Sequence, residues 1–124
     1  MKIKIKRPPR VFQAGENVKI KDCAEIKLNA DEQVTFVTER AAEYDLVRKS
    51  WGFYATPSLN GRLKKFGLHA VLVKNSKDQF YVMIVEKGSE PQFQNYLRME
   101  NQKIVAWLHN DQDLENLQRK IQKG

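Results

Sequence analysis

Aromatic and basic residues gather in one stretch of the chain, from Tyr44 to Gly67. Trp51, Phe53 and Tyr54 place three rings within four positions, and basic residues lie on both sides of them. Aromatic rings stack on planar ligands, and a guanidinium can hold a phosphate or carboxylate through two hydrogen bonds. The stretch therefore predicts a site for an anionic small ligand, a nucleotide or a phosphorylated sugar. The residues that carry this prediction are Trp51, Tyr54, Ser58, Asn60 and Arg62, with Arg48 and Lys49 as outer charge.

A short helix is expected to position these groups. Thr56 suits a helix N-cap and Pro57 the first helical position, which predicts a short helix or 3₁₀ turn near residues 57–66. The free N–H groups near Ser58 and Leu59 would then carry partial positive charge and attract an anion.

The same stretch also has an interpretation without any ligand. In that interpretation Trp51 and Phe53 fill the core, Tyr54 lies at its edge, and the basic residues form a solvated face. Apolar and aromatic spacing is more often a sign of packing than of binding.

Other chemistry finds less support in the sequence. His69 and His109 are far apart and belong to no ligand-spaced motif, so no metal or other cofactor is expected. The single cysteine, Cys23, has no neighbouring histidine to activate it and is interpreted as a structural thiol. Acids between Asp31 and Asp45 could serve an enzyme only if one were held in a desolvated site with a raised pKa. No glycine-rich phosphate-binding motif is present.

The charge of the chain leaves nucleic acid open as a partner. The 124 residues carry a formal net charge of +7, and Lys2, Lys4 and Lys6 form one side of an alternating N-terminal strand. RNA or single-stranded DNA could bind such a strand and a neighbouring sheet face. No apolar run approaches the ~20 residues that span a bilayer, and the first residues lack the apolar region of a secretory signal. We therefore expect a cytoplasmic protein with no membrane partner.

Alternating and periodic apolar residues predict the following elements. Strands are expected in the first half at 2–6, ended by Pro8 and Pro9, at 18–20 and 24–28 with a tight turn or a bulge at 21–22, at 33–38 and at 44–47. The second half predicts a hairpin of strands 68–74 and 79–86, a helix 89–100 with a capping box of Ser89 and Gln92, a strand 103–108 and a helix 111–122.

These elements predict one α+β domain over residues 1–124, with a mainly antiparallel sheet and two C-terminal-half helices packed on it. The leading functional hypothesis is a non-catalytic or accessory domain that binds an anionic small ligand at the aromatic and basic stretch. Nucleic-acid binding, a small enzyme that uses the acids between Asp31 and Asp45, and a protein-interaction module are the alternatives.

Overall fold

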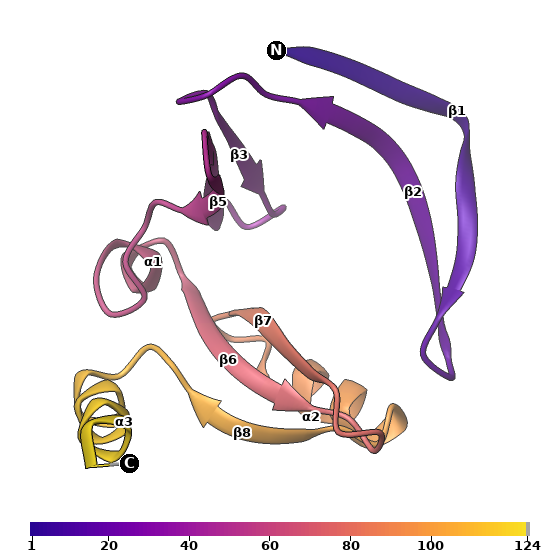
Figure 1. Cartoon of the computed structure of the whole chain (residues 1–124). Coiled ribbons are helices and arrows are strands. Elements are labelled where there is room, and N and C mark those ends of the chain that lie inside the picture. Colours follow the sequence, from indigo (N-terminus) through magenta and orange to yellow (C-terminus); the bar gives the residue numbers. More distant parts are fainter. Residues whose placement is uncertain (124) are drawn as a thin grey trace. The chain divides into compact units, whose positions relative to one another are not determined.

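In the computed structural model, which describes residues 1–123, eight strands and three helices form an α+β fold. The strands make three antiparallel sheets rather than the single sheet that was expected: β1–β2, β3–β4–β5 and β7–β6–β8. The α+β class predicted from the sequence is confirmed (Figure 1).

The chain divides into two compact units. Unit 1 comprises residues 1–35 and 45–56, and unit 2 comprises residues 36–44 and 57–123. The division crosses β3 (Gln33–Val37) and β4 (Glu43–Lys49). The prediction of one domain over residues 1–124 stays a prediction.

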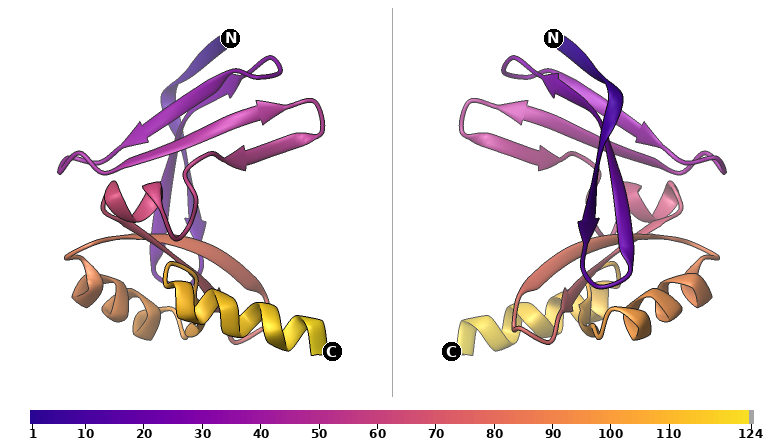
Figure 2. Two further views of the ribbon diagram at one scale, coloured as in Figure 1. Left: turned by 90° about the vertical axis from the view of Figure 1, so that its left-hand side faces the viewer. Right: turned by 90° about the vertical axis from the view of Figure 1, so that its right-hand side faces the viewer.

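In unit 1, β1 (Lys2–Ala14) and β2 (Val18–Lys27) form a long antiparallel ribbon, which is the indigo and violet hairpin of Figure 2. The prediction that Pro8 and Pro9 end the first strand is wrong. Regular pairing stops at Ile5 and resumes at Arg10, so the prolines lie in a break in the ladder, where no N–H is needed for pairing.

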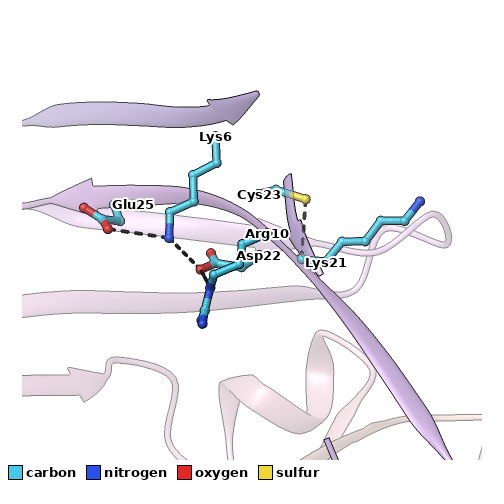
Figure 3. Close-up of polar contacts among 6 residues, drawn as sticks. All are labelled: Lys6, Arg10, Lys21, Asp22, Cys23 and Glu25. Carbon is cyan, nitrogen blue, oxygen red and sulfur yellow. Dashed lines mark hydrogen bonds and ion pairs between the residues drawn. The ribbon is translucent and has the colours of Figure 1, made fainter. Parts of the chain in front are cut away.

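Charged side chains cross this break. Lys6 Nζ lies 2.5 Å from Asp22 Oδ2 and 3.5 Å from Glu25 Oε1, and Arg10 Nε donates to the same Asp22 oxygen at 3.2 Å (Figure 3). The hydrogen bond from Lys6 holds the pKa of Asp22 below its usual value. Lys21 and Asp22 lie within the continuous strand β2, so a tight turn at 21–22 is wrong. The register of the ladder does shift between Asp22 and Ala24, which agrees with the alternative of a bulge.

In unit 2, β6 (Leu68–Lys74) is the central strand, with β7 (Phe80–Glu86) on one side and β8 (Lys103–Trp107) on the other. Helix α2 (Glu90–Met99) connects β7 to β8, so the predicted strand–helix–strand order is confirmed. Both outer strands run antiparallel to β6, which separates them.

Two clusters of buried side chains form the core of unit 2, one on each side of β6. Val71 and Val73 pack with Leu97 of α2, whereas Ala70 packs with Leu63 of the short helix α1 (Arg62–Lys65). The alternation of β6 side chains between the two faces of the sheet explains this division.

The two later helices begin in different ways. Ser89 is the N-cap of α2, but its side chain makes no capping hydrogen bond, so the predicted capping box is wrong. The Ser89 hydroxyl instead accepts from Arg40 at 2.6 Å. Asn110 does cap α3 (Asp111–Lys123), because its Oδ1 accepts from the N–H of Gln112. No residue of α3 is fully buried, so this helix packs less deeply than its apolar stripe predicts.

Candidate functional site

The predicted site residues are divided between the two units. Arg48, Lys49, Trp51 and Tyr54 belong to unit 1, whereas Ser58, Asn60 and Arg62 belong to unit 2. The two groups are therefore considered in turn.

The first group lies on a tight hairpin. Lys49 pairs with Gly52 at the end of the ladder between β4 and β5 (Gly52–Ala55), which leaves a two-residue turn that carries Trp51. Gly52 has φ +148°, a conformation that L side chains rarely adopt, and this explains the glycine at the turn. We refer to residues 48–54 as the aromatic turn.

The rings of the aromatic turn are exposed rather than buried. Trp51 is 69% exposed and Phe53 58%, so the interpretation that these two side chains fill the core is wrong. Trp51 stacks on Tyr54 with 5.9 Å between ring centroids, and Arg48 lies 5.6 Å from the centroid of the Phe53 ring. Lys49 Nζ contacts Asp31 Oδ1 at 2.5 Å.

The helix near the second group starts later than the sequence predicts. Helix α1 has four residues and starts at Arg62, and Gly61 rather than Thr56 occupies its N-cap. The carbonyl of Ser58 accepts from the N–H groups of Gly61 and Leu63, so Ser58 lies in a turn before the helix. A side chain at position 61 would come within 2.3 Å of Ser58 Oγ, which is why glycine suits this turn.

Asn60 and Arg62 make contacts inside unit 2. Asn60 Nδ2 donates to Asp111 Oδ1 at 2.8 Å, and Arg62 lies 5.6 Å from the centroid of the Phe66 ring. The expected helix N-terminus near Ser58 is thus wrong, because the chain turns there before the helix begins.

A cavity that the sequence did not indicate lies at one end of the unit 2 sheet. It has a volume of about 570 Å³, within the range of small-ligand pockets, and we call it the turn–helix cavity. Its lining comes from the end of β6 and the turn after it, the last part of α2, and the loop into β8. The lining residues are Lys74, Asn75, Ser76, Asp78, Leu97, Arg98, Asn101, Gln102 and Lys103.

Asn75 holds the turn that forms one wall of this cavity. Its Oδ1 accepts from the backbone N–H groups of Lys77 and Gln79, both at 2.9 Å. Its Nδ2 donates to Gln79 Oε1 at 2.8 Å. Asp78 adopts the left-handed conformation (φ 60°), which asparagine and aspartate tolerate best among residues with a side chain. The predicted four-residue polar turn is therefore a rigid, internally bonded structure.

The opposite wall is the C-terminal end of α2. Asn101 adopts φ 54° and the N–H of Gln102 donates to the carbonyl of Leu97 at 2.9 Å, so the helix ends as the sequence predicts. Arg98 donates through Nη2 to Asn95 Oδ1 at 3.1 Å, which fixes its guanidinium on the last turn of the helix. The bond from Gln102 satisfies the Leu97 carbonyl, one of the helix carbonyls that would otherwise be unpaired at this end.

Positive charge predominates in the cavity lining. It contains the cations Lys74, Arg98 and Lys103 and one acid, Asp78. Lys74 and Lys103 are direct cross-strand partners between β6 and β8, an arrangement in which like charges repel. Asp78 Oδ1 contacts Lys74 Nζ at 2.9 Å and so balances one of the two lysines.

An unsatisfied acceptor accompanies these cations. Gln102 Oε1 is buried and has no hydrogen-bond partner among the residues that the structure describes. Buried polar atoms are nearly always paired, so this oxygen is an exception within the cavity wall. Because the oxygen is buried, a ligand in the cavity would reach it only after a movement of the Gln102 side chain.

Sequence reasoning missed this cavity because its residues come from three separated segments. The one feature that could have indicated the cavity is the pairing of β6 with β8, because it places Lys74 opposite Lys103 in the ladder. The sequence predicts both strands but not their register, so it cannot place these lysines opposite each other.

Tertiary structure also brings together the two histidines. His69 and His109 stack with ring centroids 4.0 Å apart and an angle of 4°, and the edge of Trp107 contacts the pair at 5.4 Å from His109. Burial lowers the pKa of His109, and the positive charges of His69 and Lys64 lower it further. Within residues 1–123 no group of three histidine, cysteine or acidic side chains could hold a metal ion.

The remaining candidates lie in ordinary surroundings. Cys23 is exposed, and its Sγ donates to the carbonyl of Lys21 at 3.4 Å (Figure 3). Among the acids between Asp31 and Asp45, Glu32 accepts from the N–H of Asn29, and this bond lowers the pKa of Glu32. A general acid needs a raised pKa, so Glu32 is unsuited to that role.

Comparison with known proteins supplies no further assignment. In the part of the chain that the structure describes, no helix is long and apolar enough to cross a membrane. No protein-family model, curated protein or solved structure matches this chain.

Proposed function

We propose that unit 2 binds a small anionic metabolite, a nucleotide or a phosphorylated sugar, in the turn–helix cavity. The observation that carries the proposal is a cavity of about 570 Å³ whose lining includes three cations, Lys74, Arg98 and Lys103, and only one acid, Asp78. An anion between these groups would relieve their mutual repulsion, and charge-assisted hydrogen bonds are stronger than neutral ones. The ligand class is the one that the sequence suggests, at a different place in the chain.

The lining also supports a ligand with hydroxyl groups. The polar side chains of Ser76, Asn101 and Gln102 line the cavity, and Leu97 offers a small apolar surface. A sugar phosphate or nucleotide combines a charged group with hydroxyls and an apolar face, which matches this mixture. The proposal is a binding, non-catalytic role, and it includes the cytoplasmic location expected from the sequence.

The test is a titration of isotope-labelled protein with sugar phosphates, sugar nucleotides and free nucleotides, followed by amide chemical shifts. The expected shifts lie in residues 74–79 and 97–103. Lys103→Gln should weaken binding roughly tenfold, because one charged hydrogen bond contributes about 1.5–3 kcal/mol and this lysine is exposed. Isothermal titration calorimetry of the variant measures the change.

The chain offers a matched control in the same turn. Lys77 is exposed and lies beside the cavity lining without belonging to it. Lys77→Gln removes the same charge from the unit and should leave the affinity within twofold. If Lys77→Gln and Lys103→Gln lost equal affinity for the ligand, the net charge of unit 2 would explain the loss, and the assignment to the cavity would be refuted. Shifts confined to residues 48–62 would return the site to the stretch first predicted.

A further inference from the structure

We infer that unit 1 presents a separate surface for single-stranded nucleic acid, with the aromatic turn as the platform on which bases stack. The inference is independent of the metabolite proposal, because the aromatic turn and the turn–helix cavity belong to different units.

The first step concerns the exposed rings. Trp51, Phe53 and Tyr54 are 69%, 58% and 44% exposed, an unusual concentration of aromatic surface on four consecutive residues. Stacking between a base and an aromatic side chain tolerates every base, because each base has a π face. Apart from its two chain neighbours, nothing lies within 4 Å of the position where a Cβ of residue 52 would stand, so no other part of the chain covers the turn at Gly52.

The second step concerns the faces of the hairpin. Phe53 lies opposite Arg48 in the ladder and Tyr54 lies opposite Val47, so the two rings point to opposite faces of the sheet. Trp51 stacks on Tyr54 and extends that ring surface at the tip of the turn. The turn therefore offers one face with a pair of stacked rings and another face with a ring beside a guanidinium.

The third step concerns charge. Unit 1 holds ten lysine or arginine residues and six acids, a formal charge of +4. Among residues 1–123, no ion pair engages the ribbon lysines Lys2, Lys4, Lys19, Lys21 and Lys27. Lys2 lies directly opposite Lys27 in the ladder, where like charges repel unless an anion lies near them. A polyanion is the partner that complements this surface.

These steps favour nucleic acid over a purely charged polymer and over a protein. A polyphosphate would meet the lysines but would leave the rings unused. A protein partner could contact the rings, but it would also need carboxylates placed to pair with the exposed lysines of unit 1. Single-stranded nucleic acid alone supplies both planar bases and a regular row of phosphates.

The experiment measures binding of labelled oligo(dT) and oligo(U) by fluorescence anisotropy together with the emission of the protein's own tryptophans. Trp51→Ala and Tyr54→Ala should each weaken binding roughly 5- to 100-fold, the range of base stacking on an aromatic ring. Emission of Trp51 should be quenched in the wild type, and Trp51→Phe should keep part of the affinity while losing the quenching. The slope of log K against log salt should be roughly −0.7 for each phosphate neutralised.

Phe80→Ala is the matched control. Phe80 is 56% exposed and has Lys74 6.0 Å from its ring centroid, so it reproduces the environment of Phe53 in unit 2. This variant should bind as the wild type does. The inference is overturned if oligonucleotides leave Trp51 emission unchanged, if Trp51→Ala binds as tightly as Phe80→Ala, or if inorganic polyphosphate competes as well as oligo(dT) at equal charge. Circular dichroism verifies that each variant is folded.

Discussion

The stability of unit 2 should depend strongly on the Asn75 side chain, although this residue lies in an exposed turn. Its amide makes three hydrogen bonds, two accepted from the N–H groups of Lys77 and Gln79 and one donated to the Gln79 side chain. Each such bond contributes about 0.5–1.5 kcal/mol net. Asn75→Ala removes all three and should therefore lower the free energy of unfolding of unit 2 by about 2 kcal/mol.

A graded series of variants tests the hydrogen-bond reasoning. Asn75→Asp retains both acceptor bonds and loses only the donor bond, so it should cost about 1 kcal/mol. Ser76→Ala is the control in the same turn, because Ser76 is exposed and its hydroxyl makes no hydrogen bond within residues 1–123. Its effect should stay within about 0.5 kcal/mol.

The two tryptophans make the assay specific for unit 2. The chain has one tryptophan in each unit, Trp51 and Trp107, so Trp51→Phe leaves Trp107 as the reporter. Trp107 packs edge-on against Phe93 of α2 and therefore senses the loss of the unit 2 core. Urea unfolding followed by this emission gives the free energy, and hydrogen exchange at the amides of residues 77 and 79 should accelerate. A loss below 0.5 kcal/mol for Asn75→Ala, or equal losses for Asn75→Ala and Asn75→Asp, would refute the reasoning.

Two further predictions concern the histidine pair and the aromatic turn. Burial and the charges of His69 and Lys64 lower the pKa of His109 in the folded state, and Asp113 opposes this effect. The contribution of His109 to the stability of unit 2 should therefore be complete above the unfolded pKa of 6.5, and it should be lost as the pH falls below that value. His109→Gln should flatten this pH dependence in urea unfolding between pH 7.5 and 5, and an unchanged slope would contradict the prediction. Gly52→Val should lower the free energy of unfolding by about 1–3 kcal/mol, because the position has φ +148°. The variant should also lose the near-ultraviolet circular dichroism signal of the turn. A stability equal to that of the wild type would show that a side chain adopts this angle without cost.

Local patterns in the sequence predict most elements of unit 2. The apolar runs of 68–74 and 79–86 with a polar turn between them become β6 and β7, and the periodic run after Ser89 becomes α2. Asn101 ends that helix in the left-handed conformation, as its residue type favours. These features depend on side-chain size and backbone preference within a few residues, so the sequence contains them directly.

Unit 1 resists the same treatment because its structure depends on pairing between strands. Pro8 and Pro9 predict the end of a strand, yet β1 continues past them. The ladder is interrupted at these prolines, opposite Cys23 of β2, and pairing then resumes. Exposed tryptophan and phenylalanine at a hairpin tip contradict the expectation that large rings are buried. The ladder between β4 and β5 decides where the rings of Phe53 and Tyr54 point, and the sequence does not reveal that pairing.

The sequence by itself determined the α+β class, the basic charge, the polar turn after β6 and the presence of unusual rings near position 51, because composition and short-range periodicity encode them. Tertiary structure alone decided which charged residues meet. Lys74 and Lys103 are 29 positions apart and become neighbours through the register of β6 and β8. His69 and His109 become a stacked pair through the same sheet. Register and the pairing of distant strands depend on the sum of many weak contacts, and no single stretch of sequence contains that sum.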